Sequence, residues 1–304
     1  MSEKRWGVIL AGGDGTRLLP LTRLLAGDER PKQFCLIGGD ETLLERTRRR
    51  VSMSIAPQHL AVVVTETHEP FYRSAVDRMS PENLIVQAKN KGTAPAILYS
   101  LLRIDKITPN AMVAFFPSDH YFSDDERFMS HVEASFDAVA ARPEFVILLG
   151  MTPDSPEEQY GWIEGGPSVF ENDSGSFYKV TRFWEKPSRR LAQELMNRGC
   201  LWNSFVMISR VHTLLAMIRR AVPDLYRRFA VTKELGLPAE QKLTRQLYGS
   251  MASINFSQSV LANRPQDLSL FPVSGVKWSD LGEPSRVLST FAPRERYATT
   301  ACAV

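Results

Sequence analysis

The sequence is poor in cysteine, and its cysteines form no pattern. The three, Cys35, Cys200 and Cys302, are far apart and odd in number. This argues against a disulfide framework, and no metal-ligand or redox spacing occurs among them. We expect Cys35 and Cys200 to be small buried residues in a protein of a reducing compartment, with the cytoplasm as the default location.

Long apolar runs and an excess of one charge are also missing. The apolar run at residues 6–11 ends in glycines, so it is too short for the core of a signal peptide or for a membrane span. The 37 basic and 34 acidic residues leave a net charge of only +3, which does not indicate nucleic-acid binding. The basic run at residues 46–50 is interpreted as a solvated helix face. We therefore expect neither a membrane nor a nucleic-acid partner.

Apolar residues are nevertheless plentiful. They make up 43% of 304 residues, which is enough to bury a core without disulfides or a structural metal. The length suits one large α/β domain with an appendage. No internal repeat is evident.

Strands and helices alternate through the first 150 residues. Apolar runs predict buried strands at residues 6–11, 60–65, 84–87, 111–116 and 145–150. Helical spacing predicts helices at residues 42–53, 69–79, 93–107 and 125–141, with Thr93 as the N-cap of the third and Pro95 in its first turn. The alternation favours a mostly parallel sheet covered on both faces, with the ligand at the carboxyl ends of its strands.

The pattern changes after residue 150. Short strands are predicted at residues 161–164 and 178–184, and helices at residues 189–198, 210–221, 224–235 and 240–248. This half is interpreted as a smaller mixed lobe over the ligand site. We expect one domain at residues 1–290, divided into two halves at residues 1–150 and 151–290. A short, frayed tail at 291–304 would follow.

A glycine-rich turn follows the first predicted strand. Its residues Leu10, Ala11, Gly12, Gly13, Gly15 and Thr16 are candidates for nucleotide contact, because glycines let backbone N–H groups approach phosphate oxygens closely. The turn is not a Walker loop, since no Gly-Lys-Ser/Thr follows, and it lacks the dinucleotide pattern GxGxxG. Arg17 and Lys32 flank it, and two such cations could clamp a triphosphate and neutralise the leaving pyrophosphate.

The segments GGDGTRLLPLT and PKQF together resemble the signature of the sugar-1-phosphate nucleotidyltransferases. The Gln after the Lys is similar to the form found in mannose-1-phosphate guanylyltransferases. The resemblance implies a Rossmann-like, doubly wound, mixed but mostly parallel sheet, the glycosyltransferase-A-like nucleotidyltransferase fold. It further implies a catalytic domain with a nucleotide-binding half (1–150) and a sugar-phosphate-binding half (151–290). The expected reaction is transfer of GMP from GTP to mannose 1-phosphate, giving GDP-mannose and pyrophosphate.

Two more segments resemble the nucleotide-binding motifs of this family. Gln87 with the run NKGTAPAI resembles a stretch that lies near the base, which makes Gln87, Gly92 and Thr93 candidate nucleotide ligands; Ala88 stands where Pro is usual. The segment FPSDH resembles P-A-D-H, which assigns Ser118 to the nucleotide and Asp119 to Mg²⁺, a cation that prefers carboxylate, phosphate and water oxygens. His120 is interpreted as a supporting residue.

The second half carries the segments that resemble sugar-binding motifs. They assign the sugar phosphate to Glu158 and Gly161 in EEQYGWI, Glu185 and Lys186 in FWEKP, and Asn203 in WNSF. Gln159 replaces the usual Thr, and Asn255 in SINF replaces an Asp. Phe205 stands where Gly is usual, so we expect a differently shaped pocket.

The segment WSDLG resembles the last motif of the family and assigns Asp280 as the second Mg²⁺ ligand. The resemblance implies in-line attack by the sugar phosphate on the α-phosphorus, with Lys186 orienting the attacking group. That phosphate is a dianion near neutral pH, so no general base is needed, and no Ser-His-Asp or Cys-His set is found.

Three alternatives stay open at this point. The same chemistry could use UTP, dTTP or CTP, or glucose or heptose phosphate. The chain could also be a catalytically inactive paralogue that binds sugar nucleotides, although the five charged residues Arg17, Lys32, Asp119, Lys186 and Asp280 are all present. A dehydrogenase is disfavoured because the dinucleotide pattern is missing. The chain ends too soon for the C-terminal β-helix or isomerase domain of longer members, so we expect no isomerase activity, and a homodimer is one hypothesis for assembly.

Overall fold

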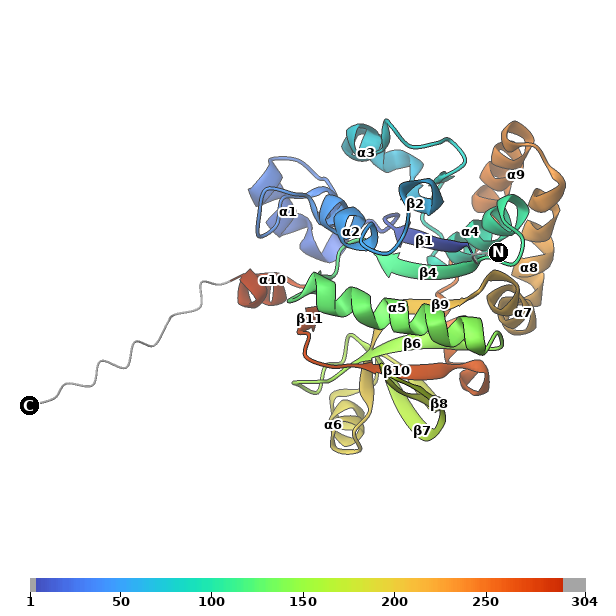
Figure 1. Ribbon diagram of the computed structural model, residues 1–304. Coiled ribbons are helices and arrows are strands. Elements are labelled where there is room, and N and C mark those ends of the chain that lie inside the picture. The colour runs from blue at the N-terminus through green and yellow to red at the C-terminus, as the bar shows by residue number, and fades with distance from the viewer. Residues whose placement is uncertain (1–3, 292–304) are drawn as a thin grey trace, which may run out of the picture.

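A computed structural model of the protein describes residues 4–291 (Figure 1). The predicted tail, apart from Phe291, and Cys302 lie outside the described residues. Within them, Cys35 and Cys200 are buried, as expected. No helix in residues 4–291 is both long enough and apolar enough to cross a lipid bilayer.

A nine-stranded sheet organises the molecule, with the strand order β3-β2-β1-β4-β9-β6-β10-β8-β7. Its strands are β1 (Arg5–Leu10), β2 (Leu60–Thr65), β3 (Leu84–Gln87), β4 (Met112–Pro117), β6 (Val146–Met151), β7 (Gly161–Asn172), β8 (Gly175–Glu185), β9 (Leu201–Arg210) and β10 (Ser269–Val273). A separate pair joins β5 (Tyr121–Phe122) to β11 (Trp278–Ser279).

The sheet is mixed but mostly parallel, which confirms the predicted fold class. Strands β3, β2, β1 and β4 pair in parallel, and β10 pairs in parallel with β6. Strand β9 runs antiparallel between β4 and β6, and β8 and β7 add antiparallel pairings beyond β10.

Strand β9 was not predicted from the sequence, because polar residues interrupt its apolar run. Inside the sheet those polar groups find partners. The Ser204 hydroxyl donates to Leu149 O at 2.6 Å, and the Ser209 hydroxyl donates to Phe145 O at 2.9 Å. A central strand can therefore carry serines when the neighbouring strand offers carbonyl groups.

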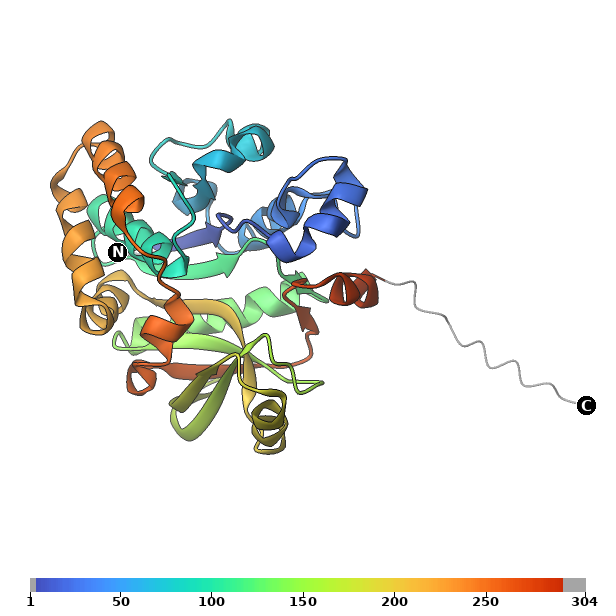
Figure 2. The same ribbon diagram turned by 180° about the vertical axis from the view of Figure 1, so that it is seen from behind.

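Helices cover both faces of the sheet (Figures 1 and 2). They are α1 (Leu19–Ala26), α2 (Leu43–Val51), α3 (Glu69–Val76), α4 (Thr93–Ile107), α5 (Asp125–Ala141), α6 (Arg189–Asn197), α7 (Val211–Ala221), α8 (Pro223–Ala230), α9 (Leu237–Ser250) and α10 (Pro284–Phe291). Successive strand residues alternate between two cores. Val62 belongs to the core on the face covered by α2 and α5, and Val63 belongs to the core on the face covered by α4 and α7. Burial on both faces explains why the sequence of β2 is apolar throughout.

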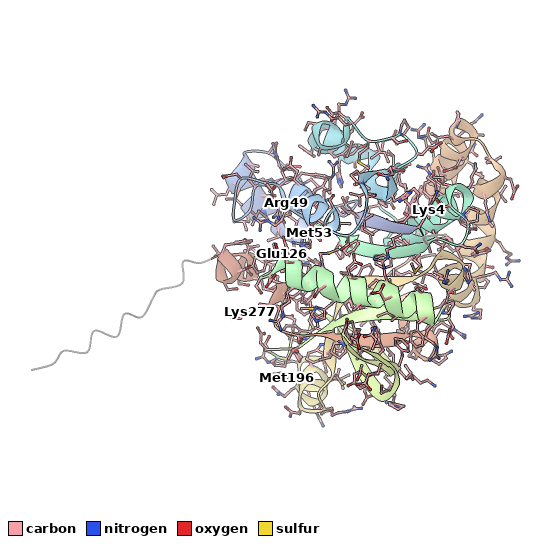
Figure 3. All side chains as sticks on the ribbon, in the orientation of Figure 1. Lys4, Arg49, Met53, Glu126, Met196 and Lys277 are labelled. Carbon is pink, nitrogen blue, oxygen red and sulfur yellow. The ribbon has the colours of Figure 1, made fainter. Side chains whose placement is uncertain are left out.

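Helices α2 and α5 meet on the face seen in Figure 3, where Arg49 and Glu126 are labelled. The buried Arg50 guanidinium lies 2.5 Å from the Asp125 carboxylate, and Arg49 lies 3.5 Å from it. Burial lowers the pKa of Arg50, and Asp125 opposes that shift. The ion pair with Asp125 allows Arg50 to be buried. The prediction that the basic run at 46–50 is a solvated helix face is therefore wrong for Arg50.

The prediction that Thr93 caps α4 is wrong. The helix begins at Thr93, and Gly92 is its N-cap with φ 82°. A Cβ on Gly92 would lie 2.4 Å from Ile254 O, so only glycine fits there. The Thr93 hydroxyl instead accepts a hydrogen bond from Phe256 N at 3.0 Å. Pro95 lies in the first turn, as predicted.

Candidate active site

A cavity of about 560 Å³ opens at the carboxyl ends of β1 and β4. Its lining includes the following predicted site residues: Leu10, Gly12, Gly13, Arg17, Gln87, Gly92, Thr93, Ser118, Asp119, Gly161, Glu185, Lys186, Asn203 and Asp280. Five others do not line it: Ala11, Gly15, Thr16, Lys32 and Glu158. Motifs from both halves of the chain therefore meet at one place.

A larger cavity, of about 740 Å³, lies at the opposite ends of the strands, beside Phe145 at the start of β6 and Ser269 at the start of β10. None of the predicted site residues lines it. We assign the site to the smaller cavity because the glycine-rich turn and the charged motifs lie there, at the carboxyl ends of β1 and β4.

The glycine-rich turn is held by side chains beneath it. The Gln33 amide donates to Ala11 O at 3.0 Å and to Gly13 O at 2.7 Å, and the Thr65 hydroxyl donates to Gly12 O at 2.8 Å. A Cβ on Gly12 would lie 2.4 Å from the Gln87 amide nitrogen. A glycine at position 12 therefore lets the turn pass close to the buried Gln87 side chain. Gln33 was not among the functional residues predicted from the sequence.

The two predicted cations have different surroundings. Arg17 is exposed, and its guanidinium donates to the Gln159 side chain at 3.3 Å across the cavity. Lys32 is buried, with its ammonium 2.6 Å from Asp280 O, 3.0 Å from Leu281 O and 3.1 Å from the Asp119 carboxylate. Lys32 therefore links the segment of Asp119 to that of Asp280 without lining the cavity, whereas Arg17 lines it.

Asp280 is fixed through one carboxylate oxygen. Its Oδ1 accepts from Gly282 N at 2.8 Å and from the Tyr160 hydroxyl at 3.1 Å, and the Arg286 guanidinium lies 3.2 Å away. Burial alone would raise the pKa of Asp280, but the charges of Lys32 and Arg286 outweigh it, so the pKa lies below its ordinary value. Asp280 is therefore ionised at neutral pH.

Arg286, on α10, was missed by sequence reasoning. Its guanidinium also approaches Glu157 at 2.9 Å and lies 4.9 Å from the centre of the Tyr160 ring. The guanidinium nitrogens make no well-angled hydrogen bond, so the attraction is mainly Coulombic. No local pattern marks this residue, because its partners come from distant parts of the chain.

The carboxylates of Asp119 and Asp280 suit a hard divalent cation, with substrate oxygens completing the coordination shell of the ion. Asp119 and Asp280 both line the cavity, and residues 4–291 contain no group of three or more metal-ligating side chains that could hold an ion alone. Mg²⁺ commonly binds through one or two carboxylates together with substrate phosphates and water. The donor set therefore fits Mg²⁺.

His120 supports this edge of the cavity. Its Nδ1 accepts from the Trp278 indole N–H at 3.2 Å. Burial lowers the pKa of His120 to about 4, so the ring is neutral at physiological pH.

The opposite end of the cavity gathers the residues predicted for the sugar phosphate. Burial raises the pKa of Glu185, and the neighbouring Lys186 opposes the shift. A Cβ on Gly161 would lie 2.8 Å from the Phe183 ring and 3.2 Å from Asn203 Cβ, so the close packing there requires glycine. Glu158, by contrast, accepts from Arg189 N at 2.9 Å, at the N-terminus of α6. That position explains why Glu158 lies outside the cavity.

The sequence profile of the family described as "Nucleotidyl transferase" matches residues 6–295. The chain belongs to this family. The match confirms the resemblance inferred from the motifs, and it covers every motif that lines the cavity of this nucleotidyl transferase.

Named relatives share much of its sequence. A mannose-1-phosphate guanylyltransferase of Salmonella montevideo is 29% identical over 232 residues, covering 75% of this chain and 47% of the relative. One from Escherichia coli K12 is 30% identical over 229 residues, covering 73% of this chain and 46% of the relative. The chain spans about half the length of these curated relatives.

A solved structure supports the same relationship. The protein described as mannose-1-phosphate geranyltransferase from Thermus thermophilus superimposes with a TM-score of 0.80 at 26% identity. The match covers 95% of this chain and 80% of that one.

Proposed function

We propose that this protein is a sugar-1-phosphate nucleotidyltransferase that transfers GMP from GTP to mannose 1-phosphate. One observation carries the proposal: a single cavity unites the glycine-rich turn and Arg17 with two carboxylates and Lys186. The names of the relatives supply the choice of GTP and mannose 1-phosphate.

Each residue has a role in this scheme. Gly12 and Gly13 present backbone N–H groups to the triphosphate, and Arg17 neutralises the pyrophosphate as it leaves. Lys186 orients the attacking sugar phosphate at the other end of the cavity. Asp119 and Asp280 would hold Mg²⁺, which supplies positive charge next to the reacting phosphate when bound. Positioning and charge neutralisation are sufficient for such a transfer, since the attacking phosphate is already ionised.

The test is a substrate panel. Pyrophosphate release would be measured for GTP, UTP, dTTP and CTP against mannose, glucose and heptose 1-phosphates, with Mg²⁺ and with EDTA. We expect Mg²⁺-dependent release that is fastest with GTP and mannose 1-phosphate. Preference for another pair would reassign the substrates, and no release with any pair would favour the inactive sugar-nucleotide-binding alternative.

A further inference from the structure

The backbone of β9 is strained where it passes the cavity. Among the described residues, the non-glycine positions with positive φ are Asn110, Lys186, Phe205 and Leu281. Asn tolerates this conformation, and Asn110 is exposed and remote from the cavity. Phe205, with φ 61°, lines it. Strained residues of this kind persist where the surrounding structure requires them, and they cluster at functional sites.

The strain coincides with a break in strand pairing. Met207 pairs with Leu148 and Asn203 pairs with Gly150, so β9 contains two more residues than β6 between these pairs. Phe205 lies in this bulge. Bulges redirect side chains and are common beside active sites, and this one turns a residue of a central strand toward the cavity.

Two contacts show what the conformation achieves. The backbone N–H of Phe205 donates to Asn203 Oδ1 at 3.1 Å. With its oxygen engaged, the Asn203 amide has its NH₂ group to offer to a ligand. The Phe205 ring packs edge-on against Phe256, with 6.3 Å between ring centres. The ring is thereby fixed while part of it faces the cavity.

We propose that Phe205 is a specificity-determining residue of the sugar-phosphate end of this cavity. Its ring provides an apolar wall on which the C–H face of a hexose packs, while Asn203 and Glu185, which line the same cavity, offer polar groups to its hydroxyls. The same wall excludes a hexose that carries a bulky substituent on that side, such as an N-acetyl group. This inference rests on the proposed function and adds the selection of the sugar to it.

The test compares Phe205→Gly with Asn110→Gly. Glycine adopts positive φ freely, so Phe205→Gly keeps the backbone contact with Asn203 and removes only the ring. Asn110→Gly is the matched control, because it changes a second positive-φ residue away from the cavity. Phe205→Ala removes the ring but retains the strained backbone.

We expect Phe205→Gly to raise KM for mannose 1-phosphate about 10-fold, in line with the loss of one apolar contact. KM for GTP should stay within about 2-fold, since the ring is assigned to the sugar end. The ratio of kcat/KM for N-acetylglucosamine 1-phosphate to that for mannose 1-phosphate should rise about 10-fold. Phe205→Ala should shift this ratio in the same direction, and Asn110→Gly should leave it unchanged.

An unchanged ratio in Phe205→Gly, or an equal change in Asn110→Gly, would overturn the inference. Failure of the proposed function would look different, because the wild-type protein would then release no pyrophosphate with any substrate pair. In that event, calorimetric binding of mannose 1-phosphate and N-acetylglucosamine 1-phosphate to wild type and Phe205→Gly still tests the wall. Equal affinities in the two proteins would refute it.

Discussion

At the residue scale, the two cations of the N-terminal motifs contribute in different ways. Arg17 is exposed and has one neutral partner across the cavity, Gln159. Lys32 is buried, and its ammonium contacts two carbonyl oxygens and a carboxylate. An exposed cation beside a phosphate site can affect rate with little effect on folding, whereas a buried cation with several partners contributes to folding itself.

Replacing Arg17 by Ala should therefore reduce kcat about 10²–10³-fold, the usual effect of losing one group that stabilises developing charge. The melting temperature should change little, because Arg17 has few contacts to lose. Pyrophosphate release and thermal denaturation measure the two effects. Arg190→Ala, which changes an exposed arginine on α6, is the control. Near-normal turnover in Arg17→Ala would remove Arg17 from the mechanism.

Lys32→Met should destabilise the protein by about 2–3 kcal/mol, because it leaves the Asp119 carboxylate and two carbonyl groups without their partner. Urea unfolding followed by tryptophan fluorescence measures this. The free energy of unfolding of Arg17→Ala provides the comparison. Equal stability of Lys32→Met and wild type would show that the buried contacts of Lys32 are not needed for folding.

At the scale of elements, helix starts are fixed by local chemistry. Helix α2 opens with a capping box, in which Thr42 and Glu45 each accept a hydrogen bond from the backbone of the other. Thr42→Ala should lower the free energy of unfolding by about 1 kcal/mol. Chemical denaturation measures the loss, and Thr42→Ser, which retains the hydroxyl, should recover most of it. A Thr42→Ala protein as stable as Thr42→Ser would contradict this role of the cap.

The sequence predicted the elements whose signals are local. The strands β1, β2, β4 and β6 are apolar because both faces are buried, whereas one face of β3 is only half-buried. Their apolar runs and the turns between them were sufficient to locate all five. Strand β9 was missed because its serines are satisfied only by β6, a partner that the local pattern does not reveal. Thr93 was misplaced because remote residues satisfy this helix start: Ile254 O accepts from Ala94 N at 3.1 Å, and the Thr93 hydroxyl accepts from Phe256 N.

The same distinction applies to the candidate site. Asp119 could be predicted because it follows β4, and the ends of parallel strands meet at one edge of a sheet. Lys186 follows β8, which runs antiparallel to β10, so only the resemblance of its motif predicted it. The burial of Lys32 depends on Asp280, which is 248 positions away. Arg286 reaches the site because α10 packs beside Glu157 and Asp280. Pairings over such distances have no signature in a single sequence.

At the scale of the whole molecule, a buried polar network joins α4, α9 and the edge of the sheet. The Arg103 guanidinium lies 2.7 Å from the Glu240 carboxylate and donates to Leu84 O at 2.9 Å, while the Tyr99 hydroxyl donates to Glu240 at 2.6 Å. Glu240→Ala would leave a buried arginine without its counter-charge. We expect it to lower the free energy of unfolding by about 3–5 kcal/mol.

Denaturant unfolding of Glu240→Ala measures this loss. A second variant, Glu234→Ala, changes a carboxylate in the short helical turn at Val231–Glu234 and should have little effect on stability. If both variants unfolded at the same denaturant concentration as wild type, the network would not hold α9 in place.

The position of β9 also bears on how the chain can be assembled. This strand, Leu201–Arg210, occupies the gap between β4 and β6, both of which precede residue 152. During synthesis, β4 and β6 leave the ribosome before β9 does. The backbone N–H and C=O groups that will pair with β9 therefore have no partner until β9 has emerged. A chain severed near residue 150 would likewise expose both edges in the N-terminal fragment, so we expect that fragment to aggregate unless the remainder is supplied to it.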